Sequence, residues 1–131
     1  MHKMIKVIQT NNAPAAIGPY SQAIAANGML YLSGQIALDP RSGELNNSDI
    51  ESETRQVLDN LAAVLRAAGS DLDKVVKCSI FLSDMSHYAK VNKVYAEYFT
   101  DTHPAREAVA VKTLPKEVNV EISAIALCTT N

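Results

Sequence analysis

Residues 74–82 (KVVKCSIFL) have the pattern of a β-strand in the middle of a sheet. The run is rich in apolar and β-branched residues, which favour strands. We therefore expect a central strand, with Cys78 in the core as a free thiol, because free cysteines are among the most buried residues. The side chains alternate, with Val76, Cys78, Ile80 and Leu82 on one face and Lys77, Ser79 and Phe81 on the other.

Two segments with helical spacing flank this strand. In the first, Ser48 and Glu51 have the spacing of a capping box, and Gly69 is a typical helix stop. The second is expected to begin with Ser86 as its cap and to be ended by Pro104. The apolar stripes are Leu58, Leu61, Ala62, Leu65 and Ala68 in the first helix and Tyr88, Val91, Tyr95 and Tyr98 in the second.

The other periodic segments predict further strands. These are expected at residues 4–9, 107–112 and 118–127, while a turn-rich loop over 11–19 leads into residues 20–24. Asn27-Gly28 is a strong hairpin signal before a strand over residues 29–36. Within that strand, Leu30, Leu32 and Ile36 are expected on one face and Tyr31, Ser33 and Gln35 on the other.

The order strands, helix, strand, helix, strands predicts one α+β domain over residues 1–131. Both helices are expected on one face of a mixed sheet. The opposite face would carry Tyr31, Phe81 and Ile125, and a monomer would expose them as an apolar patch. Burial of this patch against sister subunits predicts a homo-oligomer.

The composition gives no reason to expect nucleic acid or a membrane as a partner. The 131 residues include 12 basic and 14 acidic ones, a formal net charge of -2, so no positive field runs along the chain. Cys78 and Cys128 have no paired spacing, and the N-terminal residues lack the apolar stretch of a signal peptide. We expect a cytoplasmic protein with free thiols.

The sequence contains none of the common motifs for metal, nucleotide or serine-hydrolase chemistry. GxGxxG, GxxxxGK[ST], HExxH and GxSxG are all absent. The three histidines are far apart and have no cysteines at ligand spacing, so no metal site is expected. Any chemistry must then come from charged and polar side chains.

Arg106 and Glu121 are the charged residues best placed for such chemistry. Arg106 follows Pro104-Ala105 at the start of a strand, where a rigid turn would aim its planar guanidinium at a carboxylate. Glu121 interrupts an apolar strand, and a half-buried carboxylate there would hold or polarise water. Without further information, each residue also fits a solvated or salt-bridged surface position.

Four polar or small residues are weaker candidates. Gly34 lies within a strand pattern, where glycine marks a bulge or a close approach. Ser33 would offer a hydroxyl but has no nearby base that would make it a nucleophile. Tyr20, after Gly18-Pro19, would close a pocket, and Asn92 would be either a pocket donor or a structural contact.

Five segments, in order and spacing, resemble the reactive-intermediate deaminase (Rid) family of the RidA/YjgF type. They cover nearly the entire chain, from NAPAAIGPYSQ (12–22) and YLSGQI (31–36) through LDNL (58–61) and VN (91–92) to the PAR, LPK and VEI motifs within residues 104–122. The resemblance implies a chorismate-mutase-like α+β fold. It also implies a homotrimer with a pocket at each subunit interface.

The resemblance further implies an imine and enamine deaminase that needs no cofactor. Such a hydrolase converts 2-iminobutanoate, 2-iminopropanoate and similar species to 2-keto acids and ammonia, a form of metabolite damage control. It implies a carboxylate-binding role for Arg106, a water-handling role for Glu121, and pocket positions for Tyr20, Ser33, Gly34, Asn92 and Ala108.

Two residues depart from the family pattern. Ala108 stands where many members have cysteine, a position thought to act largely through its backbone. Glu107 replaces a commoner small residue and would be able to pair with Arg106 and weaken its hold on a carboxylate. Other functions also stay open: a keto-acid-binding regulatory trimer, a holdase, and a ribonuclease or translation inhibitor, although the acidic chain argues against RNA.

Overall fold

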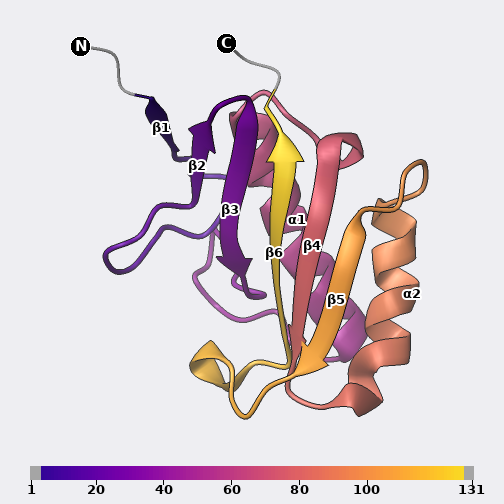
Figure 1. Cartoon of the computed structure of the whole chain (residues 1–131). Coiled ribbons are helices and arrows are strands. Elements are labelled where there is room, and N and C mark those ends of the chain that lie inside the picture. Colours follow the sequence, from indigo (N-terminus) through magenta and orange to yellow (C-terminus); the bar gives the residue numbers. More distant parts are fainter. Residues whose placement is uncertain (1–3, 129–131) are drawn as a thin grey trace.

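The computed structural model describes residues 4–128, and their strands form one sheet in the order β1-β2-β3-β6-β4-β5 (Figure 1). Strands β4 and β5 run parallel, whereas the other neighbours are antiparallel, so the sheet is mixed as expected. The strands are β1 (Ile5–Ile8), β2 (Ala23–Ala26), β3 (Met29–Gln35), β4 (Val75–Leu82), β5 (Ala105–Ala110) and β6 (Val120–Leu127).

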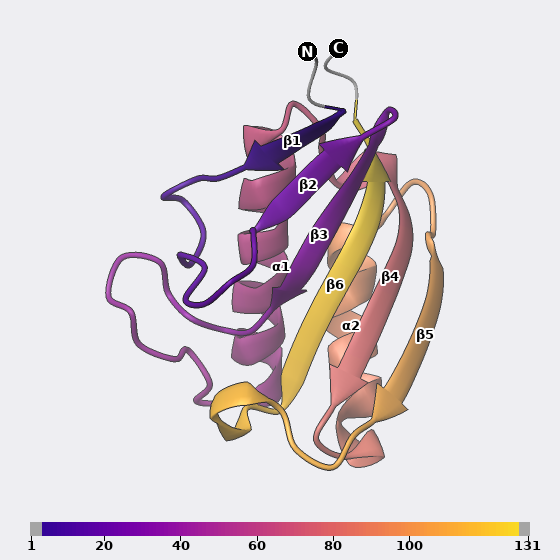
Figure 2. The same cartoon turned by 60° about the vertical axis from the view of Figure 1, so that its left-hand side comes forward.

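Two helices, α1 (Ile50–Ala67) and α2 (Tyr88–Tyr98), cover one face of this sheet (Figures 1 and 2). Their buried stripes pack against Leu30, Ile80 and Ile122 of the central strands, and each such side chain contributes roughly 1.5–3 kcal/mol by burial. The α+β arrangement is therefore confirmed. Neither helix of the described part has the length and hydrophobicity needed to cross a membrane.

The helix caps differ from the expected ones. Asp49 caps α1, because its Oδ1 accepts a 2.7 Å hydrogen bond from the Ser52 amide, so the capping box at Ser48 and Glu51 is wrong by one residue. Likewise, Asp84 rather than Ser86 caps the 3-10 turn (Met85–His87) that precedes α2. Serine and aspartate are both good caps, and the local geometry selected the carboxylate in both cases. The second helix also ends at Tyr98, well before Pro104.

The hairpin and the bulge predicted around β3 are both present. Asn27 and Gly28 adopt φ values of 52° and 76°, as a two-residue turn between β2 and β3 requires. The pairing of β3 with β6 shifts between Leu32 and Gln35, which is a β-bulge around Gly34. This bulge corrects one expectation: Gln35 is buried and pairs with Ile122, so it does not share the face of Tyr31.

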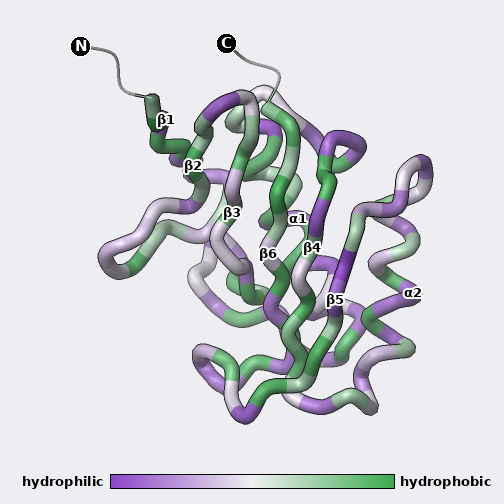
Figure 3. The backbone as a smooth tube through the Cα atoms, in the orientation of Figure 1, coloured by the Kyte–Doolittle hydropathy of each residue, from purple (hydrophilic) through white to green (hydrophobic). Residues whose placement is uncertain are grey.

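The other face of the sheet has no helix over it within residues 4–128 (Figure 2). Tyr31 lies opposite Ile125 on this face, and Phe81 lies opposite Glu121. Tyr31 is 48% exposed. Figure 3 shows that hydrophobic residues predominate along the central strand β6, which contributes to both faces. The uncovered face is therefore confirmed, but it is mixed in character, because Glu121 and Ser123 of β6 lie on it beside Tyr31, Phe81 and Ile125.

A buried carboxylate that the sequence analysis did not single out connects α1 to the start of β6. The side chain of Glu53 is fully buried, and it accepts hydrogen bonds from the Asn119 amide (2.7 Å), the Asn119 side chain (3.0 Å) and the Val120 amide (3.0 Å). Hydrogen bonds to an ionised acceptor are stronger than neutral ones. Glu53 therefore fixes the chain directly before Glu121.

Candidate functional site

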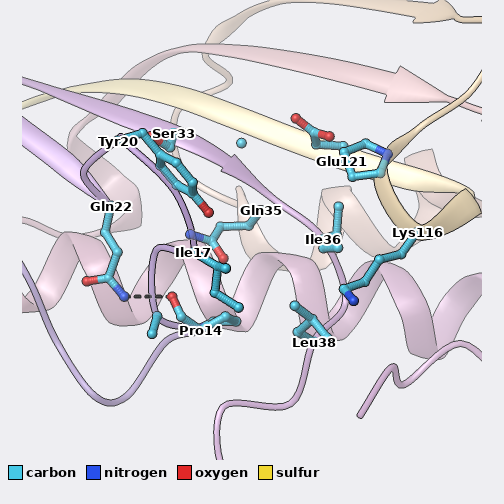
Figure 4. A pocket seen from close by; sticks show the side chains of 13 residues that line it. Pro14, Ile17, Tyr20, Gln22, Ser33, Gln35, Ile36, Leu38, Lys116 and Glu121 are labelled. Atoms are coloured by element: carbon cyan, nitrogen blue, oxygen red, sulfur yellow. Dashed lines mark hydrogen bonds between the residues drawn. The ribbon is translucent and has the colours of Figure 1, made fainter. Parts of the chain in front are cut away.

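A cavity of about 550 Å³ lies where β3 ends, beside the connection that leads into β6 (Figure 4). Three segments line it: the loop before β2, residues 33–38, and the residues from Pro115 to Glu121. Its walls are mainly apolar, and a few polar side chains reach it. Those polar side chains belong to Tyr20, Gln22, Ser33, Gln35, Lys116 and Glu121.

The loop that carries Tyr20 is held by hydrogen bonds. The buried side chain of Gln22 accepts a bond from the Thr10 amide (2.7 Å) and donates one to the Pro14 carbonyl (2.8 Å; Figure 4). The Ser33 hydroxyl donates a 2.6 Å hydrogen bond to the Ser21 carbonyl, so it is a structural contact as well as part of the cavity wall. Tyr20 is 54% exposed, and its hydroxyl points into the cavity.

Glu121 lies at one end of this cavity, against the bulge at Gly34. Its side chain is half-buried and forms no hydrogen bond or ion pair with the other described residues. Burial without a compensating partner raises the pKa of this carboxyl group above its usual value. Such a group takes up a proton more readily than an exposed glutamate, which suits it to acid–base work.

Arg106 lies in a second, smaller cavity of about 400 Å³ between β5 and α2. Its Nη1 donates a 2.7 Å hydrogen bond to Asn92 Oδ1, and its Nη2 donates one of the same length to the Tyr88 hydroxyl. The guanidinium carbon also lies 4.8 Å from the ring centroid of Tyr95 and 5.6 Å from that of Tyr88. These contacts fix the plane of the guanidinium.

All of these contacts with Arg106 come from neutral groups. No carboxylate of the described chain lies within 4.0 Å of the guanidinium. Two of its five N–H groups are used by Asn92 and Tyr88, so three remain for a ligand. A half-buried guanidinium that is held by neutral groups is suited to binding an anion.

Glu107 does not weaken this arrangement, contrary to the expectation from the sequence. Its side chain forms an ion pair with Lys77 (3.0 Å) and accepts a hydrogen bond from the Ser79 hydroxyl, and both contacts lower the pKa of its carboxyl group. Successive residues of a strand point to opposite faces. Glu107 therefore lies on the open face, whereas Arg106 lies on the helix-covered face.

The same reasoning separates Arg106 from Glu121 within one chain. Arg106 pairs with Cys78, which is fully buried beneath the helices, and Glu121 pairs with Phe81 of the open face. Because paired residues share a face, the two charged side chains point to opposite sides of the sheet. Ala108 lies on the same face of the sheet as Arg106, because it pairs with Ile80 and packs against the core.

The site residues expected from the sequence thus form two groups. Tyr20, Ser33, Gly34 and Glu121 surround the larger cavity, whereas Asn92 and Arg106 belong to the smaller one. Comparison with known proteins shows the family to which the chain belongs. The family described as Endoribonuclease L-PSP matches residues 10–128. The chain belongs to this family, which is the RidA/YjgF (Rid) family.

Relatives of this Rid-family chain include proteins with and without a named activity. A RutC family protein of Pyrococcus horikoshii is 54% identical over 123 residues, 94% of this chain and 98% of that protein. The mouse protein named 2-iminobutanoate/2-iminopropanoate deaminase is 48% identical over 122 residues, 93% of this chain and 90% of that protein.

Solved structures of the Rid family have the same fold. YyfA of Yersinia pestis, a Rid-family protein, superposes with a TM-score of 0.92 at 53% identity, covering 94% of this chain and 98% of that one. TdcF of E. coli, solved with bound serine, superposes with a TM-score of 0.90 at 39% identity, covering 93% of this chain and 98% of that one. The comparisons therefore support the fold along almost the whole chain.

The sequence analysis did not identify four further residues that line the two cavities or contact Arg106. Tyr88 and Tyr95 were placed only in an apolar helix stripe, although both contact Arg106. Lys116 lies in the LPK motif and Gln35 in the YLSGQI motif, so the motif positions alone were a signal that they line a site. No group of three or more metal-ligating side chains occurs within residues 4–128.

Proposed function

We propose that this chain hydrolyses reactive 2-imino acids and the enamines that give rise to them. The substrates are 2-iminobutanoate, 2-iminopropanoate and related species, and the products are 2-keto acids and ammonia. The observation that carries this proposal is the Arg106 guanidinium, which is oriented by Asn92 and Tyr88 and left without a carboxylate partner. The name of the mouse relative agrees with the proposal.

In the proposed reaction, Arg106 binds the carboxylate of the imino acid and so fixes the position of C2. Glu121 accepts a proton from water as the oxygen attacks this carbon, which gives a carbinolamine. Glu121 returns this proton to the carbinolamine nitrogen, the C2–N bond breaks to release ammonia, and the hydroxyl proton passes to Glu121 as the C2–O bond becomes the carbonyl of the keto acid. An iminium carbon is already electrophilic, so positioning and proton transfer are enough.

This reaction needs Arg106 and Glu121 on the same substrate, although one chain holds them on opposite faces of its sheet. A complete site can form when Arg106 of one copy meets Glu121 of another. We therefore include in the proposal a homotrimer with its pockets at the subunit interfaces. Burial of the apolar open face, with Tyr31 and Phe81, would stabilise such an assembly.

The primary test couples a threonine dehydratase to trapping of the nascent imine with semicarbazide. Wild-type protein should divert the imine from the trap to the keto acid, and Arg106→Ala should lose most of this effect. If neither protein accelerates keto-acid release, the proposal fails for these substrates. Saturable 2-oxobutanoate binding without turnover would then favour the alternative, a keto-acid-binding regulatory trimer.

A mixing experiment tests whether the site is shared between copies. Arg106→Ala and Glu121→Ala are each expected to be inactive alone. Unfolding them together and refolding the mixture would produce interfaces with both residues intact, so about one quarter of the wild-type activity should return. Each variant refolded alone is the control. A mixture that stays inactive, although it forms mixed trimers, would contradict a site shared between subunits.

A further inference from the structure

The larger cavity extends well beyond Glu121, and its far part contains polar groups without partners. Gln35 is only 6% exposed, yet its side-chain amide forms no hydrogen bond with the described residues. Lys116 lines the same cavity and forms no ion pair within 4.0 Å among residues 4–128, even with Glu121. The polar atoms of the Gln35 amide are not enclosed by protein and face the cavity, so they are available to a ligand.

These groups lie apart from the carboxylate of Glu121. In Figure 4 the ammonium group of Lys116 points toward Leu38, away from Glu121, and the side chain of Gln35 enters the cavity from β3. The cavity of about 550 Å³ therefore has the Glu121 carboxyl group at one end and carries a cation and an amide at other places on its wall.

The turn that presents Lys116 is a strained one. Lys116 and Glu117 both adopt left-handed backbone conformations, with φ of 55° and 56°. Residues other than glycine rarely adopt this backbone conformation, and such strain persists where the surrounding structure enforces it. Here the following residues Asn119 and Val120 are fixed by the buried carboxylate of Glu53, so the position of the turn is fixed too.

The wall around these groups is apolar. Ile17, Ile36 and Leu38 all line this cavity. Side chains of this kind pack well against methylene groups, and the amide and ammonium groups would bind a polar end. A carboxylate accepts hydrogen bonds from both an ammonium and an amide N–H, and the bond to the ammonium is charge-assisted.

We infer that Lys116 and Gln35 bind a carboxylate at the end of the substrate side chain. The preferred substrates would then be 2-imino acids with an acidic side chain, such as the five-carbon dicarboxylic imino acid derived from glutamate. This inference rests on the proposed function, because it assumes that the reacting carbon lies near Glu121. It assigns Lys116 and Gln35 to substrate selection and gives neither a part in the chemical step.

The test compares two substrates in the presence of semicarbazide. The glutamate-derived imine is generated by a glutamate oxidase, and 2-iminobutanoate by threonine dehydratase. The measured quantity is the ratio of kcat/KM for the two substrates. In Lys116→Met this ratio should fall about tenfold, as expected for loss of one charge-assisted hydrogen bond. Lys116→Arg keeps the charge and should keep the ratio within about threefold of wild type.

Lys112→Met is the matched control, because Lys112 is exposed in the same connection between β5 and β6 but does not line the cavity. It should leave the ratio unchanged. Titration calorimetry gives a second readout: Lys116→Met should weaken the binding of 2-oxoglutarate about tenfold and that of 2-oxobutanoate much less.

The outcomes separate the two proposals. If wild type hydrolyses 2-iminobutanoate but Lys116→Met leaves both the ratio and the 2-oxoglutarate affinity unchanged, the inference about Lys116 is overturned and the deaminase proposal stands. If wild type hydrolyses neither imine, the deaminase proposal fails and the inference fails with it.

Discussion

The carboxyl group of Glu121 on β6 packs directly over the α-carbon of Gly34 on β3. A Cβ atom at position 34 would lie only 2.9 Å from Cδ of Glu121 and closer still to Oε2. Gly34 does not have a positive φ, so its backbone would accept alanine. A larger residue at position 34 would therefore have to displace the Glu121 side chain, and this relationship links the β-bulge to the candidate site.

Gly34→Ala should consequently displace the Glu121 carboxylate. We expect a loss of most imine-hydrolysing activity and a destabilisation of about 1–3 kcal/mol from overpacking, measured by urea denaturation. Glu121→Ala provides the control, since it removes the overlapping atoms. Adding Gly34→Ala to Glu121→Ala should cost almost no further stability. An equal cost in both backgrounds would contradict the steric explanation.

Tyr88→Phe should weaken substrate binding because it removes the hydroxyl that accepts from Arg106 Nη2 while keeping the ring. The expected result is a KM about three- to tenfold higher with a smaller change in kcat. Tyr98→Phe is a matched control on the same helix: its hydroxyl donates to Asp59 at 2.8 Å and does not contact Arg106. An unchanged KM in Tyr88→Phe would show that Asn92 and the rings orient the guanidinium without the hydroxyl.

The pH dependence of activity should report on Glu121. Its ionised form is the proton acceptor in the proposed reaction, and burial raises the pKa of this group above the ordinary 4.5 of glutamate. Activity should therefore rise with pH, with an inflection above that of an exposed glutamate. Glu121→Asp should keep a dependence of this kind at reduced rate, whereas Glu121→Gln should lose it. If the activity of Glu121→Gln still falls at low pH, the pH dependence belongs to another group.

The same pKa shift predicts a stability effect of definite sign. A carboxyl group with a raised pKa in the folded state favours folding when it is protonated, and this contribution is lost as the pH rises through the folded-state pKa. Glu121→Gln should therefore be more stable than wild type at about pH 7, and the difference should vanish in acid. Denaturation at matched protein concentration over a pH series is the measurement.

Glu53→Gln should destabilise the fold without any direct role in chemistry. Its carboxylate accepts three hydrogen bonds, and glutamine would replace one acceptor oxygen with a donor facing the Asn119 side chain. We expect a loss of about 2–4 kcal/mol in the free energy of unfolding. Glu51→Gln is the control, because Glu51 is in the same helix but forms only a 3.7 Å surface pair with Lys93, and it should cost less than about 0.5 kcal/mol.

Much of the fold was predictable because it depends on local patterns. The alternation in KVVKCSIFL placed Cys78 and Ile80 in the core, where both are fully buried. The Asn27-Gly28 turn follows from backbone preferences of single residues, and a glycine within a strand pattern indicated the bulge or close approach found at Gly34. The cap positions were missed because Ser48 and Asp49 are adjacent and nearly equivalent as caps, so the periodicity alone cannot choose between them.

The sequence by itself determined the order of strands and helices, the face of the sheet that the helices leave open, and the identity of Arg106 and Glu121 as the charged residues of interest. Only the tertiary structure decided that they point to opposite faces of the sheet, that Glu107 faces Lys77, and that Glu53 is buried. The physical reason is that side-chain periodicity fixes faces within one strand. The pairing register between strands far apart in sequence, which relates one face to another, is fixed only when the whole sheet packs beneath its helices.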